Sequence, residues 1–166
     1  MGPVRGTAIA VRIESLARAL GVSKGGFYGY FDDRSALLEE LLDTWERKST
    51  EEVVVRVERA GGDALDRGRR AAALTFSDEL VRIDLAVRDW ARRDPRVAER
   101  LRRIDSFRIE YLRSLMVHVC PDEDELEARC LIAFSVAIAS HLIAADHGPR
   151  SRADVRALIA QRLFAE

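Results

Sequence analysis

Apolar residues recur along most of the chain with the spacing of amphipathic helices. Ile13, Leu16, Ala17 and Leu20 follow the i, i+3, i+4, i+7 spacing of one helix face. The same period returns in residues 33–60, 63–76, 77–91, 94–116, 122–146 and 151–163. Few segments alternate with the period of two that a strand requires. The pattern therefore predicts an all-α fold with about eight helices and no sheet.

Capping and breaking residues stand where these helical patterns begin and end. Asp33 is placed to cap a helix that we expect to run unbroken to Ala60, where Gly61 and Gly62 stop it. Proline after a cap residue is a strong start signal. Further starts are predicted at Ser23, Ser77, Asp94-Pro95, Pro121-Asp122 and Ser151 with Asp154, and the helix from residue 122 is expected to reach Asp146.

Composition narrows the function classes. Hydrophobic residues make up 48% of the chain and charged residues 33%, which is typical of a globular protein. The net charge of −1 excludes a protein that coats nucleic acid by bulk positive charge. Residues 1–31 nevertheless hold four basic residues and one acidic residue, a local charge of +3. A local patch of this kind is sufficient for phosphate contacts.

The sequence gives no indication of secretion or of membrane insertion. Two cysteines, Cys120 and Cys130, give no disulfide framework, and no signal peptide opens the chain. The uncharged stretch 130–145 has 16 residues and includes Ser135, Ser140 and His141, so it is too short to span a membrane comfortably. We expect a cytoplasmic protein without a membrane segment.

Residues 16–38, LARALGVSKGGFYGYFDDRSALL, carry the strongest functional signal. They predict two short helices joined by a tight turn at residues 21–23. Small residues at the start of the second helix allow close approach to a groove, and Lys24 and the tyrosine hydroxyls can donate to phosphates. This geometry fits a helix-turn-helix. Geometry alone equally allows a plain helical hairpin without a DNA role.

The motif LA-x3-GVSKG-x-x-Y-x-x-F, followed by an acidic residue, a basic residue and a leucine-rich helix, resembles the TetR family of bacterial transcriptional regulators. Residues 85–103 also resemble one branch of that family. The resemblance implies a DNA-binding domain over residues 1–47 and a helical ligand-binding and dimerisation domain over residues 48–166. It places Ser23, Lys24, Gly25, Gly26, Phe27, Tyr28, Tyr30 and Arg34 on operator DNA.

The family's DNA-binding domain has an amphipathic helix before this motif, and the sequence begins in what resembles the loop after it. We therefore expect a truncated or mis-assigned start, which leaves Ile13, Leu16 and Leu20 without a packing partner. The resemblance implies a repressor that a small-molecule effector releases. The alternative is a helical homodimeric interaction or sensor protein that has lost DNA binding.

The helix predicted from residue 122 is apolar nearly all round from Cys130 onward, so it must contact more than its own core. Burial within one chain is the ordinary explanation of such a helix. A dimer partner explains the additional apolar faces more simply. The TetR family pairs its last two long helices across the dimer into a four-helix bundle. The predicted homodimer interface consists of Ala133, Ala137, Ser140 and Ala144 with Leu158 and Ile159.

A second set of residues is predicted to line an effector pocket, although aromatic residues and methionine at helical spacing more commonly form ordinary core. The effector is expected to be small and largely apolar. The predicted set is Trp90, Phe107, Tyr111, Met116, Phe134 and His141, with the pocket between the helices of Trp90, Tyr111 and His141.

An enzyme or a metal protein is a further class to weigh. Metal-type ligands are present at His118, Cys120, Cys130, His141 and His147. They do not form a Cys-x-x-Cys or His-x-x-x-His pair, and no glycine-rich phosphate loop follows a strand. The sequence predicts neither catalysis nor a cofactor or metal.

Overall fold

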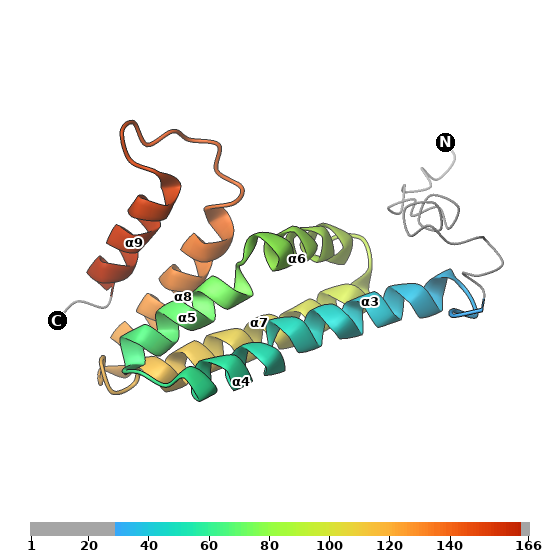
Figure 1. Ribbon diagram of the computed structural model, residues 1–166, viewed down its shortest axis with the longest axis horizontal. Helices are drawn as coiled ribbons and strands as arrows, with labels where there is room; N and C mark the ends of the chain where they lie inside the picture. Colours follow the sequence, from blue (N-terminus) through green and yellow to red (C-terminus); the bar gives the residue numbers. More distant parts are fainter. Residues whose placement is uncertain (1–28, 164–166) are drawn as a thin grey trace.

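The computed structural model describes residues 29–163, and over this range it contains seven helices and no strand. The predicted all-α fold is therefore confirmed for this part of the chain (Figure 1). The helices are α3 (Arg34–Ser49), α4 (Glu51–Ala60), α5 (Ala64–Thr75), α6 (Asp78–Ala91), α7 (Pro95–Met116), α8 (Glu123–Ala139) and α9 (Arg152–Leu163).

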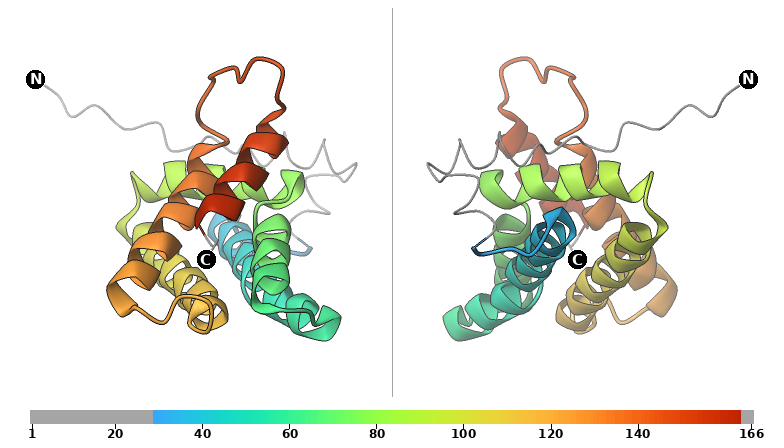
Figure 2. Two further views of the ribbon diagram at one scale, coloured as in Figure 1. Left: turned by 90° about the vertical axis from the view of Figure 1, so that its left-hand side faces the viewer. Right: turned by 90° about the vertical axis from the view of Figure 1, so that its right-hand side faces the viewer.

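Helix α7 is the central element of an elongated body (Figures 1 and 2). It packs against α5, α6 and α8, while α3 contacts α4 and α6. Helix α9 contacts α8 and lies at the opposite end of the body from the start of α3 (Figure 1). The end that leads to the predicted helix-turn-helix is thus separated from the α8–α9 end by the length of α7.

Four aspartates cap the N-termini of helices, each at the predicted start of a helix or one residue from it. The carboxylates of Asp33, Asp63 and Asp122 each accept a backbone N–H three residues ahead, all at 2.8 Å. Asp94 accepts from the N–H of Arg96 at 3.0 Å, with Pro95 as the first helical residue. These local bonds satisfy N–H groups that have no partner inside the helix.

The turn between α4 and α5 forms where the sequence predicts it. Gly61 and Gly62 have φ angles of 63° and 103°, a region that residues with a Cβ atom rarely occupy. The N–H of Gly61 donates to the carbonyls of Val57 and Glu58 and so closes the end of α4. The predicted helix stop at this pair is confirmed.

The prediction of one unbroken helix from Asp33 to Ala60 is wrong, because the helix breaks at Thr50 between α3 and α4. The Ser49 hydroxyl donates to the carbonyl of Trp45 and the Thr50 hydroxyl to that of Glu46, each at 2.6 Å. Side chains that bond to the preceding turn compete with the regular helical pattern. Thr50 accordingly leaves the helical region, with φ −127° and ψ −86°.

The predicted helix to Asp146 is also too long, since α8 ends at Ala139. The Arg152 guanidinium donates to the carbonyls of Ser140, Ile143 and Ala145, the last at 3.2 Å. A cationic donor stabilises carbonyl groups that a helix end leaves unpaired. Ala144 consequently lies in the connection between α8 and α9 rather than on a helical stripe.

Two apolar clusters hold the body together. The first joins α4, α5, α7 and α8 through Val53, Val57, Ala71, Leu115, Met116, Cys120, Leu126 and Cys130. The second joins α3, α6 and α7 through Leu42, Trp45, Val87, Val97 and Ile104. Trp45 is 1% exposed and is the largest side chain in the described residues that is buried to this degree. It therefore fixes the position of α3 against α6 and α7.

Candidate functional site

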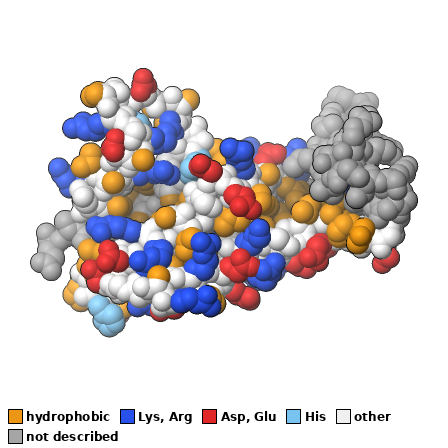
Figure 3. All heavy atoms as spheres, in the orientation of Figure 1, with side chains coloured by type: hydrophobic (Ala, Val, Ile, Leu, Met, Phe, Trp, Pro, Cys, Tyr) orange, Lys and Arg blue, Asp and Glu red, His pale blue; other side chains and the backbone are white. Residues whose placement is uncertain are grey.

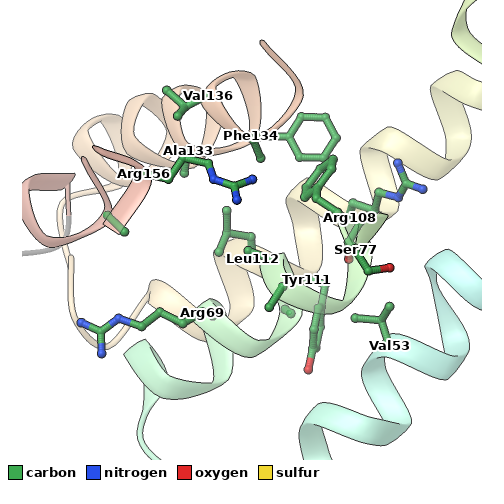
Figure 4. A pocket seen from close by; sticks show the side chains of 18 of the residues that line it. Val53, Arg69, Ser77, Arg108, Tyr111, Leu112, Ala133, Phe134, Val136 and Arg156 are labelled. Atoms are coloured by element: carbon green, nitrogen blue, oxygen red, sulfur yellow. The ribbon is translucent and has the colours of Figure 1, made fainter. Parts of the chain in front are cut away.

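A cavity of about 550 Å³ lies among α4, α5, α7, α8 and α9, with the end of α3 at one side. Its volume is within the range of pockets that hold small organic ligands. Most of the wall is apolar, and Figure 4 shows Phe134, Leu112 and Tyr111 around it. The apolar wall includes Val53, Val54, Leu65, Phe76, Phe107, Leu112, Met116, Ala133, Phe134, Val136, Ala137 and Ile159.

One wall carries a buried charge cluster that joins α6 to α7. Arg108, which lines the cavity, donates from Nη1 to Asp84 at 2.7 Å and to Asp105 at 3.4 Å. Arg88 donates to Asp84 at 2.8 Å and to both oxygens of Asp105 at 2.7 and 2.8 Å. The side chains of Arg108 and Asp84 are only 5% and 2% exposed. Such a cluster is tolerated in a core because each charge has an opposite partner.

Arg108 also connects the cavity with the junction between α3 and α4. Its Nε donates to the carbonyl of Ser49 at 3.4 Å, and its guanidinium carbon lies 5.4 Å from the centre of the Trp45 ring. Ser49 and Thr50 themselves line the cavity. The helix break is therefore part of the cavity wall.

Tyr111 contributes its ring to the cavity and directs its hydroxyl elsewhere (Figure 4). The hydroxyl donates to Glu58 of α4 at 2.9 Å, and Glu58 also pairs with Arg67 of α5. Burial, together with the neighbouring Glu58 carboxylate, raises the pKa of Tyr111 to about 12. The phenol is thus engaged in joining three helices.

We expect Tyr111→Phe to leave the affinity of the cavity for the uncharged fluorescent ketone prodan unchanged, because the ring stays and the hydroxyl points away. Alkaline titration of tyrosinate absorbance should show one of the three tyrosines with a pKa of about 12, and Tyr111→Phe should remove that transition. A large loss of prodan affinity would show that the hydroxyl faces the ligand.

A second arginine lines the cavity at the α9 side. Arg156 extends from α9 toward α7 and α8, whereas Arg69 points away (Figure 4). Nη1 of Arg156 lies 3.4 Å from Nε2 of His141. Burial, and then the charge of Arg156, lower the pKa of His141 and so favour its neutral ring, in which Nε2 can accept this hydrogen bond.

The structure brings four of the six predicted pocket residues to one cavity: Phe107, Tyr111, Met116 and Phe134. Trp90 packs instead against the cluster that joins α3, α6 and α7 and does not line this cavity, so the predicted position of the pocket beside Trp90 is corrected. His141 contacts Arg156 without lining the cavity itself. Arg108 was not among the residues predicted from the sequence to line the pocket. Its position four residues after Ile104 places a charged side chain on the apolar face of that helix, which was a usable signal.

The residues predicted for a dimer interface lie in different surroundings. Ala133, Ala137 and Ile159 line the cavity. Ser140 caps the end of α8, Ala144 is in the connection, and Leu158 is 43% exposed. These residues therefore do not lie on one continuous helical stripe, which they would have shared if α8 had extended to Asp146 as predicted.

Most of the predicted DNA-contacting residues, from Ser23 to Tyr28, lie outside the described residues. Tyr30 is 82% exposed, in the turn before α3, and Arg34 is the first residue of α3. Both are thus located where the predicted DNA-reading segment joins the body.

Residues 29–163 contain no group of three or more metal-type ligands that could hold an ion. No helix in this range is long and apolar enough to cross a membrane.

Comparison with known proteins identifies the class of the N-terminal segment. Residues 9–41 match the family described as "Bacterial regulatory proteins, tetR family". The matched residues cover the predicted helix-turn-helix and the first part of α3. The match supports membership of the tetR family, and with it the class of DNA-binding transcription regulators. None of the curated proteins and none of the solved structures matches the chain significantly.

Proposed function

We propose that the chain is a sequence-specific transcriptional repressor that a small, largely apolar effector releases from operator DNA. The observation that supports this most directly is the continuity between the matched segment and the cavity. The match at residues 9–41 extends into α3, and Ser49, the last residue of α3, lines the cavity. One helix thus connects the DNA-reading segment with the candidate effector site.

The contacts of α3 explain how an effector would act at a distance. Arg100 of α7 donates to Glu46 at 2.6 Å and to Glu39 at 3.4 Å, and also pairs with Asp43, all on α3. With Trp45 buried beside these contacts, α3 is coupled to α7, so a displacement at the cavity end would be transmitted along both helices. An effector shifts the equilibrium only by its preference for one position of α3. A tenfold change in DNA affinity needs about 1.4 kcal/mol of such preference.

Fluorescence anisotropy with two labelled duplexes tests the proposed DNA recognition. One duplex comes from the region immediately upstream of the gene, and the other has the same composition in scrambled order. The proposal expects the chain to prefer the upstream duplex. Equal weak binding to both, or no binding, would favour the alternative of a helical sensor that has lost DNA recognition.

Replacing Lys24 with alanine is expected to weaken binding to every duplex alike, because a phosphate contact carries no sequence information. The slope of log affinity against log salt concentration should fall in magnitude by about one. Arg102→Ala is the matched control, since that side chain is 72% exposed and lies on α7. If Lys24→Ala binds as well as wild type at every salt concentration, Lys24 does not contact DNA.

A homodimer is proposed from the surroundings of α9. None of the 12 residues of α9 is buried in the single chain, and an isolated helix of this length is marginally stable in water. Figure 3 shows apolar side chains among the charged ones at the α8–α9 end. The large exposed apolar residues there are Leu131, Ile132, Leu142, Ile143 and Leu158. A second copy of the chain would cover them and stabilise α9.

We expect Leu158→Glu to convert the dimer to monomers, because it places an unpaired charge in an apolar interface. Sedimentation velocity measures the change, and Val55→Glu is the control, since Val55 is 53% exposed on α4. A charge at Ala137 would be less informative, because Ala137 also lines the cavity. Unchanged sedimentation of Leu158→Glu would place the interface elsewhere.

A further inference from the structure

Arg156 is a cationic side chain of the cavity wall that no described carboxylate neutralises. It is half-buried and extends from α9 toward Leu112 of α7 and Ala133 of α8 (Figure 4). Within residues 29–163 its hydrogen-bond contact is that of Nη1 with Nε2 of His141 at 3.4 Å, and it forms no ion pair with a carboxylate. A cation beside an apolar cavity is unfavourable unless an anion accompanies it.

The other donors of Arg156 are accessible to a ligand. Nε and Nη2 make no hydrogen bond to a described residue, and they are not among the buried side-chain atoms without a partner, which belong to Trp45, Arg67 and Arg108. Both atoms therefore retain accessible surface. They form one edge of the guanidinium, and such an edge presents two parallel N–H groups that match the two oxygens of a carboxylate.

The other charged residues of the wall do not offer such a site. Arg108 is neutralised by the buried aspartate cluster of α6 and α7. Arg69 points away from the cavity and lies 3.6 Å from Asp66 (Figure 4). Asp78 is exposed in the first turn of α6, where the helix N-terminus favours its charge, and it forms no ion pair with Arg156. One negative charge would therefore compensate Arg156, whereas a dianion such as a phosphate monoester would leave a charge in excess.

We propose that the cavity binds a largely apolar monocarboxylate, whose head group accepts hydrogen bonds from Arg156 and whose apolar part lies against the rings of Phe107, Tyr111 and Phe134. This inference rests on the proposed effector function and specifies the chemical class of the effector. The wall supplies affinity for any apolar chain, because most of it is apolar. Arg156 supplies the selectivity for a carboxylate over a neutral or cationic head group.

Displacement of prodan from the full chain tests the proposal with three ten-carbon chains that differ in the head group. These are decanoate, decan-1-ol and decylammonium, at neutral pH and below their micelle concentrations. The variants are Arg156→Gln and its matched control Arg162→Gln, which changes an exposed arginine of α9 that does not line the cavity. Arg156→Lys keeps the charge and serves if Arg156→Gln does not fold. One protein concentration is used throughout, since α9 also belongs to the proposed dimer interface.

Wild type is expected to bind decanoate most tightly and decylammonium least tightly. Arg156→Gln should weaken the binding of decanoate by about 10- to 100-fold, the effect of hydrogen bonds between charged groups, and leave that of decan-1-ol unchanged. Arg156→Lys should show a smaller loss of the same kind, because it lacks the two parallel N–H groups. Arg162→Gln should bind all three chains as wild type does.

Four outcomes would overturn the proposal. The first is a wild type that binds decanoate no more tightly than decan-1-ol. The second is tightest binding of decylammonium, which would assign the head group to Asp78. The third is no loss of decanoate affinity in either Arg156 variant. The fourth is a loss that decan-1-ol or the Arg162→Gln control shares, because the effect would then be one of packing or of overall charge.

These failures are distinguishable from failure of the proposed function. If prodan and decan-1-ol bind while the preference for decanoate is absent, the effector cavity stands and the assignment of its head group is wrong. If neither prodan nor any chain binds to wild type, the effector site is removed as well. DNA recognition is measured separately with the labelled duplexes and does not depend on either result.

Discussion

Replacing Asp84 with alanine is expected to lower the free energy of unfolding by about 3–5 kcal/mol, the range for removing one partner of a buried ion pair. Asp84 is 1% exposed and accepts hydrogen bonds from both Arg88 and Arg108. Its loss leaves Arg108 with Asp105 at 3.4 Å as its remaining carboxylate partner among the described residues. Chemical denaturation at one fixed protein concentration measures the effect, since dimerisation would make stability depend on concentration.

Two variants make this expectation specific. Asp105→Ala should cost less, because the side chain of Asp105 is 22% exposed and water can replace part of the lost interaction. Asp84→Leu combined with Arg108→Met should recover most of the loss, since apolar residues of similar size can replace a buried ion pair at little cost. If the double variant is as unstable as Asp84→Ala, the cluster contributes more to the stability of the fold than the mutual neutralisation of its charges.

Trp45→Ala is expected to destabilise the protein by about 3–5 kcal/mol, as large-to-small changes of a buried aromatic residue do. Trp45 is 1% exposed, packs with Leu42, Val87, Val97 and Ile104, and lies under the guanidinium of Arg108. The change also loosens α3 from α6 and α7. Affinity for the upstream duplex should therefore fall at temperatures where the body remains folded.

The control for Trp45→Ala is Trp45→Phe. Nε1 of Trp45 has no hydrogen-bond partner among the described residues, so phenylalanine loses volume but no bond that the structure contains. Its cost should be well below that of alanine, and DNA affinity should be largely retained. Equal losses for both variants would show that the indole has a role that packing does not explain.

Helix starts were predictable because they depend on neighbouring residues. An aspartate that accepts an N–H two or three positions ahead needs no distant partner, and Asp33, Asp63, Asp94 and Asp122 all do so. Helix ends were less predictable. The break at Thr50 involves local hydroxyl bonds, but Arg108, 59 positions after Ser49, also donates to the carbonyl of Ser49, and Arg152 donates to the carbonyls after α8. Such contacts exist only once the helices have packed.

The all-α class, the helix starts and the helix-turn-helix motif in residues 16–38 could be predicted from the sequence, because each is carried by short spacings along the chain. The sequence also predicted four aromatic or methionine residues that line the cavity, since these recur at helical spacing. That Trp90 belongs to another cluster and that Arg108 lines the cavity became evident from the packing of the helices. A cavity is the space that several helices leave unfilled, and the burial of a charge depends on partners such as Asp84, 24 positions away. Both depend on packing between distant segments, which local periodicity does not encode.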